Sequence, residues 1–177
     1  MASILVTGGC GYIGSHTVLS LLLKGLDVYI IDSNQNSNPF VINRLRDILK
    51  KNKLQLTNNL YFIKGDVRIK DDLEKVFLKA LENDHNIYGV IHFAGLKAVE
   101  ESCNSPLLYW DTNLVGTINL LKVMKKYNCR NLIFSGSATI YSNSIKNKLK
   151  EDSLIKPINP YGRTKATVEI LLNDIFL

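Results

Sequence analysis

The sequence predicts an α/β fold in which a doubly wound parallel β-sheet carries helices on both faces. Short apolar runs of β type alternate with longer segments of helical periodicity along the chain, the pattern of parallel strands joined by right-handed crossovers. The β-type runs are almost continuously apolar, as strands buried on both faces should be. A glycine-rich turn between the first strand and the first helix is the third indication.

The elements are expected in strict alternation. Five strands are predicted from short, mostly apolar runs: Ser3–Thr7, Val28–Ile31, Leu60–Ile63, Val90–Phe93 and Asn131–Phe134. Five helices are predicted from apolar residues near helical spacing: Tyr12–Leu23, Pro39–Lys51, Asp71–Leu81, Pro106–Tyr127 and Pro160–Leu177. The stretch Ser142–Asn159, rich in Ser, Asn and Lys, is expected to be a loop. Because the last apolar pattern runs to Leu177 without a cap, we expect a truncated chain whose sheet is incomplete at the C-terminus.

The composition indicates one globular domain over residues 1–177, with 46% hydrophobic and 21% charged residues. No apolar run approaches the roughly 20 residues that cross a bilayer, and the first strand begins too close to Met1 for a signal peptide. The cysteines Cys10, Cys103 and Cys129 show neither a disulfide framework nor metal-ligand spacing. A cytoplasmic protein without a metal site or a membrane partner is therefore expected.

A net charge of +6 raises the alternative of nucleic-acid binding. The lysines, however, occur in short helix-like clusters, such as Lys50, Lys51 and Lys53, and they lack the interleaved aromatic residues of a stacking surface. Solvated helix faces are the favoured interpretation, and we expect no nucleic-acid partner.

A glycine motif follows the first strand directly. Gly8, Gly11 and Gly14 fit one spacing of a phosphate-binding turn, and Gly9, Gly11 and Gly14 fit another. Glycine allows a tight turn and a close approach of the backbone to a pyrophosphate, while the following helix offers free N–H groups to the anion. Glycines also collect in turns for structural reasons, but the position between strand and helix favours a Rossmann-like dinucleotide site.

Two carboxylates follow later strands. Asp32 ends the second strand, 18 residues after Gly14, where it could accept hydrogen bonds from ribose hydroxyls and would repel a 2′-phosphate. This favours NAD as the cofactor, although Asp32 could instead cap the next loop. Asp66 and Val67 follow the third strand and could meet the adenine, which spacing alone does not decide.

A tyrosine and a lysine share one face of the last predicted helix. Asn159 is a plausible N-cap with Pro160 in the first turn, and Tyr161 and Lys165 stand four residues apart. A phenol titrates near pH 10, and a neighbouring ammonium and a positive nicotinamide ring would lower that pKa and create a base. The alternative is an ordinary helix surface. Ser137, just after the fifth strand, could bond the same substrate hydroxyl or could belong to a strand-end turn.

Together these residues resemble the extended short-chain dehydrogenase/reductases, and within them the UDP-glucose 4-epimerases. The resemblance rests on four segments: Thr7–His16 (TGGCGYIGSH), Phe93–Val99 (FAGLKAV), Ser137–Tyr141 (SATIY) and Asn159–Lys165 (NPYGRTK). The chain departs from the pattern at Glu100, Gly136 and Ser142, which puts local loop geometry and sugar preference in question. Family members are about twice as long, and their C-terminal half supplies a substrate domain that this chain lacks.

The resemblance implies roles for the site residues. Tyr12 and Ile13 would line the pyrophosphate, and NAD would further meet Asp32, Asn36, Ser37, Asp66, Val67, Phe93, Ala94, Gly95, Lys97, Asn113, Tyr161 and Lys165. Asn113 also has a simpler interpretation, as a polar residue inside a long helix. Lys97, Ser137 and Tyr161 would touch a UDP-sugar, with Tyr161, Lys165 and Ser137 as the catalytic group.

The implied reaction interconverts UDP-glucose and UDP-galactose through a transient 4-keto sugar, with Tyr161 as the base. The full-length protein is expected to be a homodimer and the fragment to be almost inactive. A dehydratase would carry an Asp-Glu pair where this chain has Ala138 and Thr139, which argues against that chemistry. An epimerase for N-acetylated or uronic sugars, and a non-catalytic NAD-sensing protein, are the remaining alternatives.

Overall fold

The computed structural model describes residues 2–51, 59–141 and 148–176. The elements follow in the order β1 (Ala2–Thr7), α1 (Tyr12–Leu23), β2 (Asp27–Asp32), α2 (Phe40–Lys51), β3 (Leu60–Lys64), α3 (Lys70–Glu82), β4 (Asn86–His92), α4 (Val99–Asn104), α5 (Pro106–Tyr109), η2 (Trp110–Val115), α6 (Gly116–Lys126), β5 (Asn131–Phe134), η3 (Ala138–Ile140) and α7 (Pro160–Phe176). In this part of the chain, no helix is long and apolar enough to span a membrane.

The strands form one parallel sheet in the order β3-β2-β1-β4-β5. This is the doubly wound order 3-2-1-4-5-6 without its sixth position, which confirms the predicted fold class. The central strand β1 pairs Leu5 with Tyr29 of β2 and with Val90 of β4. The carboxyl ends of β1, β2 and β4 therefore come together at one edge, where an open parallel sheet builds its site.

The chain divides into two compact units. Unit 1 comprises residues 1–94 and 119–135, and unit 2 comprises residues 95–118 and 136–177. All five strands belong to unit 1, together with α1, α2, α3 and the greater part of α6.

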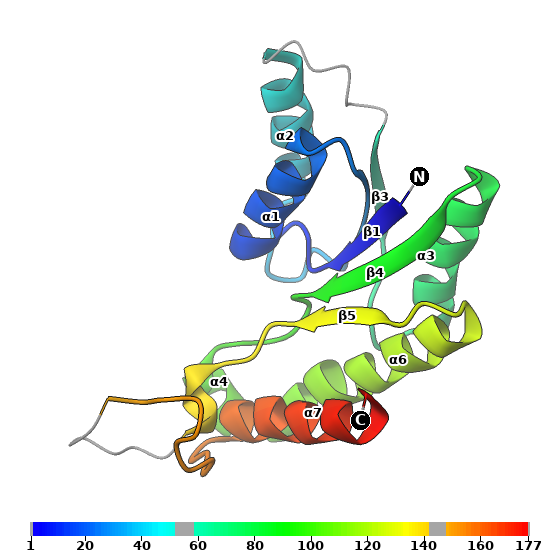
Figure 1. The fold of residues 1–177 in the computed structure, drawn as a ribbon. Coiled ribbons are helices and arrows are strands. Elements are labelled where there is room, and N and C mark those ends of the chain that lie inside the picture. Colours follow the sequence, from blue (N-terminus) through cyan, green and yellow to red (C-terminus); the bar gives the residue numbers. More distant parts are fainter. Residues whose placement is uncertain (1, 52–58, 142–147, 177) are drawn as a thin grey trace. The chain divides into compact units, whose positions relative to one another are not determined.

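Helices α1 and α2 cover one face of the sheet in unit 1, and α3 and α6 cover the other (Figure 1). Each face carries its own hydrophobic core. Alternate strand residues separate the two cores, since successive side chains in a strand point to opposite faces. Leu5, Tyr29 and Ile31 pack with residues of α3 and α6. Val6, Val28 and Ile30 pack with residues of α1 and α2. All six of these strand residues are fully buried, which accounts for the apolar runs seen in the sequence.

Unit 2 is built around α7, which packs against α4, α5, η2 and η3. The buried positions of α7 are Tyr161, Gly162, Thr164, Lys165, Ala166 and Val168. A tyrosine and a lysine thus take part in an otherwise small and apolar face. A buried lysine is rare in proteins and calls for a specific environment.

Most predicted elements are confirmed within one or two residues, and three differ. β4 begins at Asn86, four residues before the predicted start at Val90. The prediction missed these residues because they alternate between exposed and buried and do not form a continuous apolar run. The short helix α4, with two glutamates in its first turn, was not predicted. The predicted helix over 106–127 contains the π-helical segment η2, which depends on backbone hydrogen bonding that side-chain spacing does not reveal.

The predicted loop Ser142–Asn159 lies partly outside the described residues, since 142–147 are not described. Its described part contains a turn and one antiparallel bridge, in which Ile155 pairs with Tyr141. This part is otherwise irregular, as predicted.

Candidate active site

The glycine loop joins the end of β1 to the start of α1. Gly8 has a φ of +68°, and a Cβ there would lie 2.7 Å from the Ala94 backbone nitrogen. Its N–H donates to the Ile31 carbonyl at 2.8 Å. A Cβ on Gly14 would collide with the Gly8 carbonyl oxygen. Gly8 and Gly14 are therefore required by the chain's own packing, the first also by its left-handed backbone.

Gly11 differs from these two glycines. A Cβ on Gly11 would meet only the Gly8 carbonyl oxygen, at 3.3 Å, and its backbone is extended. Gly11 is the N-cap of α1 and makes no side-chain cap bond, so the first-turn N–H groups of α1 receive no side-chain acceptor from it. The next two side chains, Tyr12 and Ile13, are exposed. This helix end has the features of a phosphate cradle.

Asp32, at the end of β2, connects the glycine loop to the next loop. Its Oδ2 accepts the Cys10 N–H at 2.9 Å, and its Oδ1 accepts the Asn34 N–H and the Ser37 hydroxyl, each at 2.9 Å. Asp32 therefore caps the loop that follows β2, as the alternative interpretation predicted. Asp32 is 7% exposed, and its carboxylate is held beside the glycine loop by the bond from the Cys10 N–H. Asn36 is exposed on the same loop.

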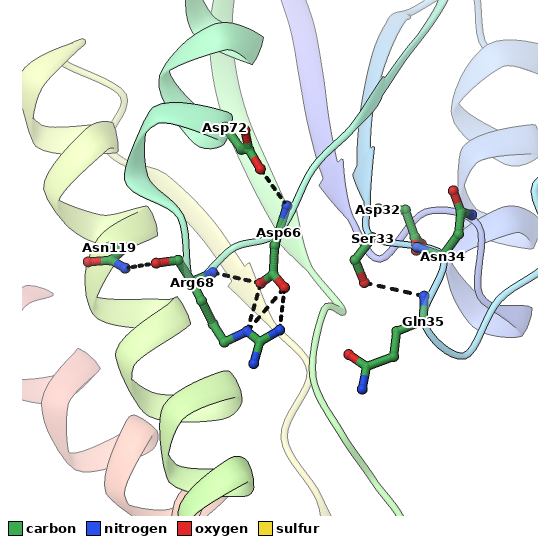
Figure 2. A network of polar contacts seen from close by, with 8 residues as sticks. All are labelled: Asp32, Ser33, Asn34, Gln35, Asp66, Arg68, Asp72 and Asn119. Carbon is green, nitrogen blue, oxygen red and sulfur yellow. Dashed lines mark hydrogen bonds and ion pairs between the residues drawn. The ribbon is translucent and has the colours of Figure 1, made fainter.

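Asp66, after β3, is engaged by Arg68, a residue that the sequence analysis did not single out. The Arg68 side chain folds back onto Asp66 (Figure 2). The distance from Arg68 Nη2 to Asp66 Oδ2 is 2.6 Å. This guanidinium lowers the pKa of the Asp66 carboxyl. The Arg68 carbonyl in turn accepts the Asn119 side-chain amide at 2.8 Å. Val67, between them, is buried in the core shared with α3 and α6.

A buried polar pair lies at the end of β4. The Thr7 hydroxyl and His92 Nδ1 are 2.6 Å apart, and the Ala94 N–H donates to the Thr7 hydroxyl at 3.1 Å. Because Ala94 also contacts Gly8, this pair fixes the backbone opposite the glycine loop. Phe93 is partly buried against the core beside α1 and α2.

The start of α7 confirms the predicted cap. Asn159 Oδ1 accepts the Gly162 N–H at 2.8 Å, and Pro160 occupies the first helical position. Tyr161 is 9% exposed and Lys165 is 6% exposed, so the two share a buried helical face. An ordinary solvated surface is therefore excluded for this pair.

Lys165 is an unusual lysine. Burial lowers its pKa from 10.5 to about 8, while the nearby carboxylate of Glu169 acts in the opposite direction. Burial likewise raises the pKa of Glu169. A Cβ on Gly136 would lie 2.8 Å from Glu169 Oε1, so glycine there leaves room for this carboxylate. Glu169 was not predicted, but its position four residues after Lys165 was a readable signal.

Asn113, in the π-helical segment η2, holds two parts of unit 2 together. Its Oδ1 accepts the Leu96 N–H at 2.8 Å, and its amide donates to the Leu96 carbonyl and to Thr164 Oγ1, both at 3.0 Å. A Cβ on Gly95 would lie 3.0 Å from Asn113 Oδ1 and 4.0 Å from Lys165 Nζ. Three predicted cofactor residues, Gly95, Asn113 and Lys165, are thus brought together in unit 2.

Two other predicted residues are less engaged. Ser137 is partly buried as the N-cap of η3, and its hydroxyl lies 2.9 Å from that of Thr139. Lys97 is exposed. The described residues contain no group of three or more His, Cys, Asp or Glu side chains that could hold a metal ion.

Known proteins match almost the whole length of this chain. The family model described as GDP-mannose 4,6 dehydratase matches residues 5–175. The chain is 50% identical over 172 residues to "Bifunctional UDP-glucose 4-epimerase and UDP-xylose 4-epimerase 1" of Pisum sativum, covering 97% of this chain and 47% of that protein. It is 46% identical over 173 residues to the Arabidopsis thaliana protein "Bifunctional UDP-glucose 4-epimerase and UDP-xylose 4-epimerase 3", covering 98% of this chain and 47% of that protein.

Among solved structures, a UDP-glucose 4-epimerase from Bifidobacterium longum in complex with NAD+ and UDP superimposes with a TM-score of 0.86 at 40% identity, covering 98% of this chain and 49% of that one. The chain spans about half the length of the curated relatives it matches. Since the family model covers nearly every residue of both units, the chain belongs to the family described as GDP-mannose 4,6 dehydratase, and its relatives there include UDP-glucose 4-epimerases.

Proposed function

We propose that this chain is the NAD-binding, base-carrying half of a UDP-sugar 4-epimerase that interconverts UDP-glucose and UDP-galactose in galactose metabolism. The observation that carries the proposal is the pair Tyr161 and Lys165, buried four residues apart on one face of α7. Relatives named UDP-glucose 4-epimerase at about 50% identity support the same reaction. A non-catalytic NAD sensor would not need a buried lysine beside a tyrosine.

The residues present fit NAD. Gly11 leaves the start of α1 open to a pyrophosphate, and Asp32 offers carboxylate oxygens for ribose hydroxyls while disfavouring a 2′-phosphate. Asp66 and Val67 would border the adenine, and Lys165 would bind the nicotinamide ribose. When bound, NAD supplies a reversible hydride acceptor for C4 of the sugar.

Tyr161 would act as the base on the sugar. The Tyr161 phenolate would take the proton of the 4-hydroxyl while the hydride of C4 passes to NAD, and the loss of both would leave a transient 4-keto sugar. After the sugar has turned over, C4 would regain the hydride and the Tyr161 phenol would return the proton to the oxygen. Lys165, one helical turn after Tyr161 on the same buried face of α7, is proposed as the second member of the catalytic pair. Ser137, with Thr139 beside it, would bond the same hydroxyl and orient it. Lys97 would contact the substrate from its exposed position.

Several sugars should be compared directly, because the Pisum sativum and Arabidopsis thaliana relatives are both named for UDP-xylose as well as UDP-glucose. Another solved relative, from Methanobrevibacter ruminantium, is a UDP-N-acetylglucosamine 4-epimerase. We propose UDP-galactose and UDP-glucose as the first pair to assay and the other two sugars as alternatives. The complete protein is proposed to be a cytoplasmic homodimer with no nucleic-acid partner.

The deciding experiment is the Tyr161→Phe substitution in the complete polypeptide that contains this chain. It should lower UDP-galactose conversion in a coupled assay about 10³-fold, the middle of the range for losing a general base, while bound NAD is retained. Tyr88→Phe, which removes a hydroxyl from an exposed ring of unit 1, is the matched control and should turn over normally. Equal turnover of wild type and Tyr161→Phe would refute the assigned base.

A further inference from the structure

A second tyrosine of unit 2 lies against the proposed base. Tyr109, the last residue of α5, is fully buried. Its ring meets that of Tyr161 edge to face, with the centroids 6.4 Å apart and the planes at 80°. Together with Leu96, these two rings form the hydrophobic core cluster of unit 2. The Tyr161 ring is therefore packed against a residue that lies 52 positions earlier in the chain.

The hydroxyl of Tyr109 is anchored at its far end. Two oxygens lie 2.7 Å from it, the Ala98 carbonyl and Glu101 Oε2. A phenol has one proton for these two acceptors, and a carboxylate is the stronger one. Burial and the Glu101 carboxylate raise the pKa of Tyr109 well above its ordinary value, so this ring stays a neutral donor. Glu101 thus holds the hydroxyl, and through it the whole ring.

The two residues that hold the Tyr109 hydroxyl, Ala98 and Glu101, lie at the start of α4. Ala98 is the N-cap of α4, and its carbonyl also accepts the Ser102 N–H at 3.0 Å. The Ser102 hydroxyl is within hydrogen-bonding distance of the Val99 carbonyl. The short helix α4 therefore presents Glu101 to Tyr109 from a fixed backbone.

We propose that Glu101 and Tyr109 are positioning residues for Tyr161, with Glu101 fixing the Tyr109 ring and that ring fixing the position of the Tyr161 ring and its hydroxyl oxygen. The inference rests on the proposed function of Tyr161. Rotation about the Cα–Cβ bond swings the hydroxyl oxygen of a tyrosine, whereas rotation about Cβ–Cγ turns the ring in place. An edge-to-face neighbour packed against the ring opposes the swing. Proton transfer needs heavy atoms within about 3 Å, so a displacement of about 1 Å can cost about 10²-fold in rate.

The test uses the complete polypeptide and three variants. Glu101→Gln removes the anchoring charge, Tyr109→Phe removes the anchored hydroxyl, and Tyr109→Leu removes the ring. Glu100→Gln is the matched control, because it removes the same charge one residue earlier on α4. The measurements are the single-turnover rate of bound NADH formation on mixing with UDP-galactose, the pH profile of that rate, NAD affinity and melting temperature.

We expect Glu101→Gln and Tyr109→Phe to slow the single turnover about tenfold and Tyr109→Leu about 10²-fold, because each loosens the base further. NAD affinity and the melting temperature of Glu101→Gln should match those of Glu100→Gln, which a purely structural role would not predict. If Glu101 acted only by its charge, Glu101→Gln would favour the phenolate and move the acid limb of the pH profile down without slowing the plateau. That outcome, or wild-type rates in both conservative variants, would overturn the proposal.

Failure of the proposed function has a different signature. In that case wild type itself would form no NADH with any of the UDP-sugars, or Tyr161→Phe would be fully active. The positioning role is then judged from a crystal structure of the Tyr109→Leu variant. A Tyr161 side chain in an unchanged conformation would refute it independently of turnover, and a rotated side chain would support it.

Discussion

At the scale of single residues, the most unusual group is Lys165, a lysine that is 6% exposed. A buried ammonium is costly, and burial accordingly lowers the pKa of Lys165 to about 8. The shift from 10.5 corresponds to on the order of 3 kcal/mol. A chain selected for stability alone would place an apolar residue here, so the position indicates a functional constraint.

This cost predicts how stability depends on pH. Below about pH 8, both the folded and the unfolded chain hold the Lys165 proton, and the folded state bears the full cost. Between about 8 and 10.5 the unfolded chain binds more protons, so this contribution to the free energy of unfolding rises with pH. Lys165→Met should therefore be more stable than wild type at pH 7 by up to about 3 kcal/mol. That gain should shrink between pH 8 and 10.5 in urea titrations without cofactor.

Two further variants sharpen this measurement. Glu169→Gln should lower the pKa of Lys165 further and so raise the free-energy cost of burying its ammonium, because the Glu169 carboxylate raises that pKa in wild type. Lys126→Met is the control, and its change in stability should have the opposite sign. Glu74 raises the pKa of the exposed Lys126, so this ammonium is favoured in the folded state. A stability gain in Lys165→Met that stays constant from pH 7 to 10.5 would contradict the assigned cause.

At the scale of elements, helix α1 of unit 1 and helix α7 of unit 2 begin in different ways. Asn159 caps α7 with its own side chain, which occupies the N–H of Gly162. The N-cap of α1, Gly11, makes no such bond. The start of α7 is thus satisfied within the chain and can hold Tyr161 rigidly, whereas the start of α1 is open to a ligand.

The two glycines Gly11 and Gly14 at the start of α1 differ in the space around them, and their substitution should therefore affect different properties. Gly14→Ala forces a Cβ onto the Gly8 carbonyl oxygen and should lower the free energy of unfolding by about 1–3 kcal/mol through overpacking. Gly11→Ala meets only one atom, at 3.3 Å, and should change stability by less than about 1 kcal/mol. Its Cβ would instead intrude on the pyrophosphate and weaken NAD binding at least tenfold.

Denaturant titration and NAD fluorescence quenching of the two variants separate these effects. If Gly11→Ala bound NAD as wild type does, the phosphate would not approach the backbone at Gly11. If Gly14→Ala were as stable as wild type, the close packing of α1 on the loop would not be needed.

At the scale of the whole molecule, the chain forms two compact units, and all five strands belong to the first. The glycine loop and Asp32 lie in unit 1, while Tyr161, Lys165 and Asn113 lie in unit 2. The proposed activity therefore needs contributions from both units. The curated relatives are about twice as long as this chain.

We accordingly predict that residues 1–177 alone retain less than about 1% of the UDP-galactose turnover of the complete polypeptide, because remote substrate binding energy is needed to orient the reacting sugar. The coupled assay on both proteins, at equal NAD occupancy, checks this. Comparable turnover would show that this chain by itself holds the UDP-sugar.

The sequence by itself determined the alternation of strands and helices, the glycine loop and the Tyr161–Lys165 pair. These features depend on local spacing, since apolar periodicity sets the elements and four residues make one helical turn. The chain's long-range partners were decided only by tertiary structure. Asp32 meets the Cys10 backbone 22 positions away, and Asn113 meets Thr164 51 positions away. Such contacts follow from how the elements pack, because residues distant in sequence carry no mark of which of them will meet.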